Sequence, residues 1–159
     1  MASAPTFRTA LALALLLAPV AATALELWVP AAPVATRVEG RTVLGYELYL
    51  DNPGATALEP LDVEVLDGTR RLARFEGAAL EARLDRSGRQ ADPAATGPIA
   101  GHGRAIVFID LALEGERPRA LSHRVRYRPA GSDLPEAGAE GARVDVLADT
   151  AAVLSPPLA

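Results

Sequence analysis

The chain lacks cysteine and lysine, and its 159 residues include only two histidines, one tryptophan and one methionine. Without cysteine it cannot form a disulfide bond, a thiolate metal site or a lipid-modified cysteine. Aromatic residues make up 4% of the chain, few for the exposed aromatic row on which carbohydrate-binding sandwiches depend. A chain of this length can bury a substantial core without covalent staples, so the missing disulfides do not indicate a compartment.

All 16 basic residues are arginine, and with 20 acidic residues they give a formal net charge of −4 at pH 7. A mild acidic excess keeps a small domain soluble and does not suit a general nucleic-acid binder. We therefore expect no nucleic-acid partner.

The N-terminus has the order of a secretory signal peptide. Arg8 precedes an apolar run at 10–21, and Ala22-Thr23-Ala24 forms a small-x-small cleavage site. About a dozen apolar residues are too few to span ~30 Å of hydrocarbon as a helix. We expect cleavage after Ala24, no stable membrane span afterwards, and a periplasmic or secreted mature protein.

Removal of residues 1–24 would leave 135 residues, which suits one domain. We predict a single β domain at 25–150, followed by a C-terminal tail or truncated linker at 151–159. Within the domain, residues rich in glycine and proline predict long loops at 85–104 and 129–141.

Apolar and polar residues that alternate with a period of two mark the strands. Residues 42–50 have one apolar face, whereas 105–113 is apolar on both faces and belongs in the middle of a sheet or under a covering element. Gly68 supplies the positive φ for a tight hairpin turn, and one helical turn is expected around Leu80. The expected strands are 25–30, 42–50, 61–66, 71–75, 105–113, 121–128 and 143–147.

About seven short strands without a sustained helical period indicate an all-β fold, an immunoglobulin-like antiparallel β-sandwich. The Cys–Trp–Cys pattern of antibody domains is missing, so the prediction concerns architecture alone. One face of each main strand supplies the core. The expected core residues are Leu44, Tyr46, Leu48, Val63, Val65, Val107, Ile109, Leu111, Val125 and Tyr127.

The residues offer little catalytic chemistry. His102 occupies a Gly-His-Gly turn and His123 lies on an apolar strand face, whereas a metal site needs three or four convergent ligands. No serine stands in a strand-turn-helix elbow. We expect a protein that is not an enzyme and has no catalytic residue, no metal and no cofactor. His102 should be an exposed turn residue and His123 a hydrogen-bonded core residue.

Arg124, Arg126 and Arg128 share one strand face, with neighbouring charges roughly 7 Å apart. Such a row could meet a polyanion or an acidic partner. It could equally protect an edge strand from aggregation or pair with carboxylates on a neighbouring strand, and we favour this structural reading. The candidate carboxylates are Asp62, Glu64 and Glu47, of which Asp62 and Glu64 should lie on a solvated face.

The outer faces of the two most apolar strands are unusually poor in charge. Glu47 and Asp110 are the only charged residues among these positions, where a sandwich strand normally shows water a polar face. A partner protein could dock there. Alternatively, residues 76–104 fold over the patch, or Phe108 is one scattered surface residue. The predicted partner-binding residues are Val43, Tyr49, Ile106 and Phe108.

Five segments carry a family resemblance: 42–52, 61–68, 75–77, 99–108 and 121–125. Together they resemble the N-terminal β-sandwich domain of exported M23-type (lysostaphin-like) zinc metallopeptidases of bacterial envelopes. The resemblance extends over roughly residues 26–158 and implies an accessory domain. That family's zinc site uses H-x-x-x-D and a later H-x-H, but Ile106 and Tyr127 stand four residues after the two histidines. No catalytic residue carries over.

The leading hypothesis is a non-catalytic exported envelope module that docks onto another protein or a peptidase domain. The alternative is a non-catalytic N-terminal remnant of a split or truncated M23-type peptidoglycan metallopeptidase. A downstream reading frame containing H-x-x-x-D and H-x-H would distinguish the two. A carbohydrate-binding sandwich and a small-molecule hydrolase rank below both.

Overall fold

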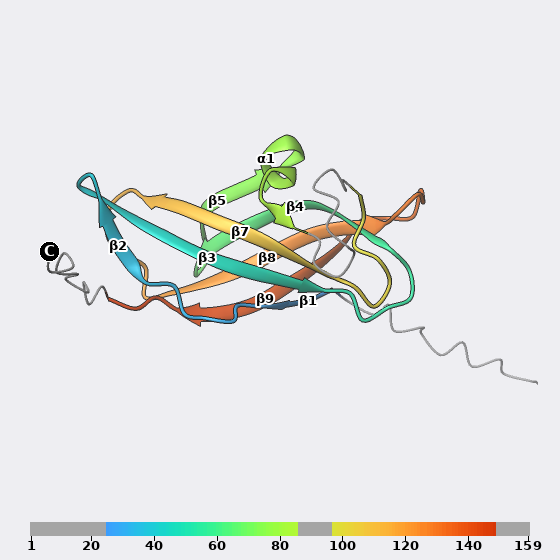
Figure 1. Ribbon diagram of the computed structural model, residues 1–159, viewed down its shortest axis with the longest axis horizontal. Helices are drawn as coiled ribbons and strands as arrows, with labels where there is room; N and C mark the ends of the chain where they lie inside the picture. The colour runs from blue at the N-terminus through green and yellow to red at the C-terminus, as the bar shows by residue number, and fades with distance from the viewer. Residues whose placement is uncertain (1–24, 86–96, 149–159) are drawn as a thin grey trace, which may run out of the picture.

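The computed structural model describes residues 25–85 and 97–148, which form two antiparallel sheets in two layers (Figure 1). The predicted signal peptide, the tail at 151–159 and part of the predicted loop at 85–104 lie outside the described residues. The first sheet contains β1 (Glu26–Trp28), β2 (Ala35–Val38), β3 (Arg41–Asp51), β6 (Leu84–Asp85) and β7 (Arg104–Leu113). The second contains β4 (Leu58–Asp67), β5 (Arg70–Glu76), β8 (Ala120–Pro129) and β9 (Ala137–Asp145), and the short helix α1 spans Gly77–Glu81.

The strand order confirms the predicted fold class. The first sheet runs β1-β3-β7-β6, with β2 also paired to β3, and the second runs β5-β4-β8-β9. If β1 and β2 are taken as two halves of a first strand A, the sheets read A-B-E-D and C′-C-F-G, the order of immunoglobulin-like sandwiches. Pro30 and Pro33, which stand between the halves, cannot donate to a strand ladder and interrupt strand A.

The core lies between the two sheets and is built from alternate residues of each long strand. Leu44 and Leu48 of β3 and Val107 of β7 are fully buried, as are Val63, Val65 and Val125 of the second sheet. All the predicted core residues are buried except Tyr46, which is half-buried and packs against the core. The predicted register of the main strands is therefore correct.

Two strand boundaries and two short strands were not predicted. β4 begins at Leu58 rather than at residue 61, because Leu58–Pro60 pair with the end of β8; Leu58 also exchanges two backbone hydrogen bonds with Ile99 (2.8 and 2.7 Å). β9 begins at Ala137, inside the loop expected at 129–141, because small residues there pair with β8. The short strands β2 and β6 were not predicted at all. Each of these segments is held by backbone pairing, which apolar periodicity does not report.

The predicted turn chemistry is confirmed. Gly68 has φ +59 in the β4–β5 hairpin, and α1 contributes the expected helical turn with Leu80 buried. At one end of the sandwich, the buried Asn52 side chain donates to the carbonyls of Thr56 (2.8 Å) and Ala100 (2.9 Å). The Asn52 side chain therefore links the loop after β3 to the loop before β7 at this end of the sandwich.

Candidate docking face

The outer face of the second sheet is covered by ion pairs between neighbouring strands. Arg128 on β8 contacts Glu59 on β4 at 2.9 Å, and Arg124 contacts Glu64 at 3.3 Å as well as Glu140 on β9. The expectation that the arginine row pairs with carboxylates is therefore confirmed. Glu47, one of the candidate partners, lies on the other sheet.

Asp62 corrects one prediction. It was expected on a solvated face, but its side chain is only 2% exposed, and it accepts hydrogen bonds from Arg74 (2.8 Å) and from Arg126. Burial opposes ionisation of Asp62, yet the hydrogen bonds from Arg126 and Arg74 hold its pKa below the ordinary value. This carboxylate ties β5, β4 and β8 together.

The first sheet presents a different outer face, on which all four predicted docking residues lie. Tyr49 is directly opposite Ile106 across the β3–β7 ladder, and Phe108 is directly opposite Glu47. Phe108 is 46% exposed, the largest apolar side chain left open in the centre of this sheet. Val43, Tyr49 and Ile106 are half-buried on the same face.

Trp28 and Arg104 complete the Tyr49 end of this face, and the sequence interpretation missed both. The Trp28 ring stacks on Tyr49 with centroids 4.5 Å apart, and the Arg104 guanidinium lies 5.1 Å from each ring. Asp51 accepts from Arg104 and from Trp28 Nε1 (2.9 Å). The Arg104 hydrogen bond is the main reason that the Asp51 pKa lies below its usual value. Intrachain contacts thus occupy Tyr49, while Phe108 remains open.

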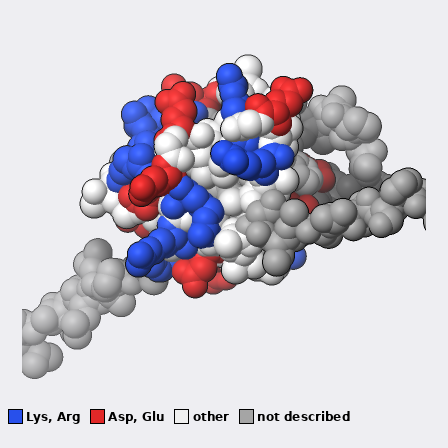
Figure 2. All heavy atoms as spheres, turned by 90° about the vertical axis from the view of Figure 1, so that its left-hand side faces the viewer, with Lys and Arg blue, Asp and Glu red and all other residues white. Residues whose placement is uncertain are grey.

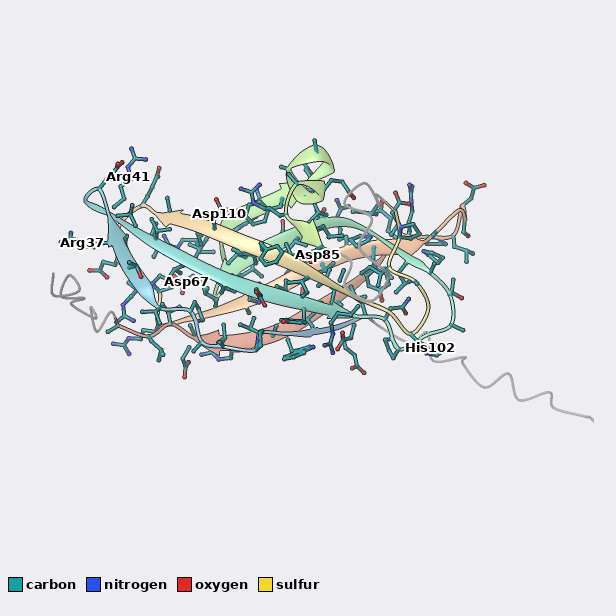
Figure 3. All side chains as sticks on the ribbon, in the orientation of Figure 1. Arg37, Arg41, Asp67, Asp85, His102 and Asp110 are labelled. Carbon is teal, nitrogen blue, oxygen red and sulfur yellow. The ribbon has the colours of Figure 1, made fainter. Side chains whose placement is uncertain are left out.

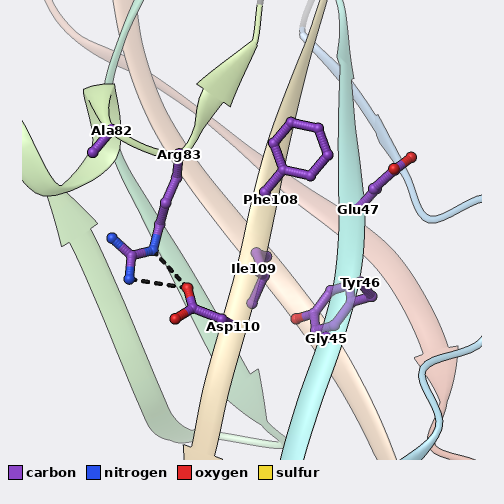
Figure 4. Close-up of a pocket in the computed structure, with 8 residues that line it drawn as sticks. All are labelled: Gly45, Tyr46, Glu47, Ala82, Arg83, Phe108, Ile109 and Asp110. Atoms are coloured by element: carbon purple, nitrogen blue, oxygen red, sulfur yellow. Dashed lines mark hydrogen bonds and ion pairs between the residues drawn. The ribbon is translucent and has the colours of Figure 1, made fainter.

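Two shallow hollows flank Gly45 on the same face, with volumes of about 640 and 560 Å³. Gly45 lines both hollows, and a Cβ added there would meet no atom within 4 Å, so the space above this residue is open. Glu47 lines both hollows and accepts a hydrogen bond from the Tyr49 hydroxyl (2.9 Å). Figure 4 shows the larger hollow, bordered by Phe108 on β7 and by Arg83.

Residues 76–85 border this face without covering Phe108. The Phe108 N–H donates to the Arg83 carbonyl (2.8 Å), and Arg83 Nη2 lies 2.9 Å from Asp110 Oδ1. The Arg83 guanidinium also packs over the Phe75 ring, with its carbon 4.6 Å from the ring centroid. The alternative that 76–104 folds over the patch is therefore not what the structure shows for residues 76–85 and 97–104.

Both histidines lie where they were expected. His102 is an exposed turn residue with φ +56, at the opposite end of the sandwich from Arg37 and Arg41 (Figure 3). His123 is fully buried, with Nε2 2.8 Å from the Tyr46 hydroxyl and Nδ1 3.1 Å from the Ala142 carbonyl. Because a carbonyl only accepts, Nδ1 donates and Nε2 accepts from Tyr46. Burial lowers the pKa of His123 to about 4, so the ring is neutral at pH 7.

Charges of both signs intermingle at the end of the sandwich shown in Figure 2, with no continuous field of one sign on that face. Within residues 25–85 and 97–148, no group of three or more His, Asp or Glu side chains could hold a metal ion. No helix in the same part of the chain is both long and apolar enough to cross a membrane.

Comparisons with protein-family models, with curated proteins and with solved structures gave no match.

Proposed function

We propose that this chain is a non-catalytic binding module that docks a partner protein on the outer face of the first sheet. The observation that carries the proposal is the contrast between the two outer faces. On one, arginines and carboxylates of neighbouring strands pair with each other. On the other, Phe108 stands open at 46% exposure and lines the larger of two hollows. An open apolar patch rimmed by polar groups is typical of protein interaction sites.

Export to a bacterial envelope belongs to the same proposal and is supported by the signal-peptide pattern of residues 1–24. A peptidase domain is one candidate partner class, suggested by the resemblance of five segments to the accessory domain of M23-type enzymes. The remnant of a split peptidase would use this face in the same way, to hold its catalytic domain. The reading frame downstream would show whether such a domain is encoded nearby.

Site-specific photo-cross-linking tests the proposal in the producing cell. A photoreactive phenylalanine analogue at position 108 should give one discrete protein adduct on irradiation, because the side chain would lie in the interface. The matched control carries the analogue at position 124, an exposed position on the opposite sheet, and should give no such adduct. Equal labelling from both positions, or labelling from 124 alone, would contradict the proposal.

A further inference from the structure

The strand that carries Phe108 has an open edge. One edge of β7 pairs with β3 along the whole length of the strand. At the other edge, β6 pairs only with Ile106 and Val107. The chain before β6 is the helix α1, which packs on β5 and β4 and does not continue the strand line. Within residues 25–85 and 97–148, no strand pairs with Asp110–Leu113 on this side.

The backbone groups at this edge can be assigned from one hydrogen bond. The N–H and C=O of a strand residue point to the same side, and successive residues alternate. The Phe108 N–H points to the open side, because it donates to the Arg83 carbonyl (2.8 Å). The N–H and C=O of Asp110 and Ala112 therefore point to the same side, where they form a template for an added strand.

We infer that the partner binds by adding an extended segment to β7 along Asp110–Leu113, antiparallel and in line with β6. This inference rests on the proposed binding function and names the class of partner: an extended polypeptide strand. The larger hollow opens at the same place, between Phe108, Asp110 and Arg83. Outward-facing side chains of the added strand would enter this hollow from the open edge of β7.

The side chains of β7 also specify a pattern for the added strand. Outward-facing residues of the new strand would meet Asp110, which is 73% exposed, near the exposed Glu114 at the end of β7. Arg83 already contacts Asp110 from the neighbouring strand position, so a basic residue matches this surface. Inward-facing residues would meet Leu111 and Leu113 at the edge of the core. The added strand should therefore alternate basic and apolar residues.

The other edges fit this role less well. β9 lies against β1, and Val34 forms a bridge with Leu147 beside them, so that side of the sandwich is closed. β5 has an irregular register near Leu72 and is contacted by α1. A second copy of this chain would place its own Asp110 near the first, and like charges across a strand pair are unfavourable.

Binding of a synthetic peptide of alternating lysine and valine to the whole chain tests this inference. We expect saturable binding, with shifts and slower hydrogen exchange at the amides of Asp110 and Ala112 measured by NMR. A control peptide of the same sequence, N-methylated on the backbone of its lysine residues, has the same charge but cannot donate hydrogen bonds to β7, because the outward-facing lysines are the residues that would pair with Asp110 and Ala112. It should bind at least about tenfold more weakly, the effect of losing about 1.4 kcal/mol. Equal binding of the two peptides would overturn the inference, as would protection at β5 or β9, or dimerisation through β7.

Ala112→Pro removes the N–H at the open edge without removing an intrachain hydrogen bond, and it should reduce peptide affinity about tenfold. Ala112→Ser keeps this N–H and should bind like the wild type. If Ala112→Pro is unfolded by circular dichroism, Asp110→Asn serves instead and should weaken lysine–valine binding relative to wild type. Unchanged binding by the folded variant would contradict the inference. An adduct from position 108 without strand addition would leave the binding function standing, whereas failure of both experiments would remove both proposals.

Discussion

The side chains on the two outer faces of this sandwich make very different contacts. On the β5-β4-β8-β9 face, charges of one strand neutralise those of the next, and Asp62 is buried beneath two arginines. On the β3–β7 face, the space above Gly45 is open, and Phe108 remains exposed with a carboxylate opposite it. Charged side chains that pair with one another can face solvent without a partner. An exposed apolar side chain rimmed by polar groups is instead typical of a protein interaction site.

The inner face of β7 should give the largest effect, because it faces the core. Ile109 is 2% exposed, so Ile109→Ala should lower the free energy of unfolding by about 2–5 kcal/mol in a denaturant titration. Ala112 is exposed on the outer side of the same strand, and Ala112→Ser should change stability by less than about 0.5 kcal/mol. Equal effects of the two substitutions would place the faces of β7 wrongly by one residue.

Acidic pH should lower the free energy of unfolding through His123, which is buried in the core. His123 has a pKa of about 4 when folded, below the ordinary value of 6.5, so the unfolded chain binds a proton that the folded chain does not. The contribution of neutral His123 to the free energy of unfolding is complete above pH 6.5 and is lost as the pH falls towards 4. This loss amounts to about 3 kcal/mol in all. Unfolding free energies measured from pH 7 to 4.5 should follow this decrease.

The matched variants separate this effect from other acid-induced changes. His123→Gln cannot take up a proton, so its stability should depend less on pH over the same range, even if it is lower throughout. His102→Gln changes an exposed turn residue and should retain the wild-type decrease. A His123→Gln curve parallel to the wild type would show that another group carries the pH dependence.

The ion-paired face should depend more on its buried carboxylate than on its exposed ones. Asp62→Asn removes the charge that Arg74 and Arg126 share, and it should cost about 1–3 kcal/mol of unfolding free energy. Glu140→Gln alters a side chain that is 64% exposed and paired with Arg124, and it should cost less than about 0.5 kcal/mol. Similar costs would mean that burial of Asp62 contributes nothing to this face.

Period-two alternation predicted the faces correctly because most inward residues of β3, β7 and β8 are apolar, with His123 as a buried polar exception on β8, and each strand is long enough to repeat the pattern. The same signal could not reveal β9, whose Ala137, Gly138 and Gly141 carry no apolar pattern, nor the burial of Asp62, which depends on arginines from two other strands. The four residues predicted to bind a partner were correctly placed on one face from the sequence. Trp28 and Arg104 were missed, because they join that face only through pairing of β1 with β3 and of β7 with β3.

The unfolding free energy of Phe108→Asn tests most directly whether the β3–β7 face is open. Asparagine is chosen because Glu47 lies directly opposite, so an introduced carboxylate would add repulsion to the effect. A side chain already 46% exposed should lose only about 1 kcal/mol in a denaturant titration. A loss of more than about 3 kcal/mol, the cost expected for a buried phenylalanine, would show that the chain itself covers Phe108 and would contradict docking at this face.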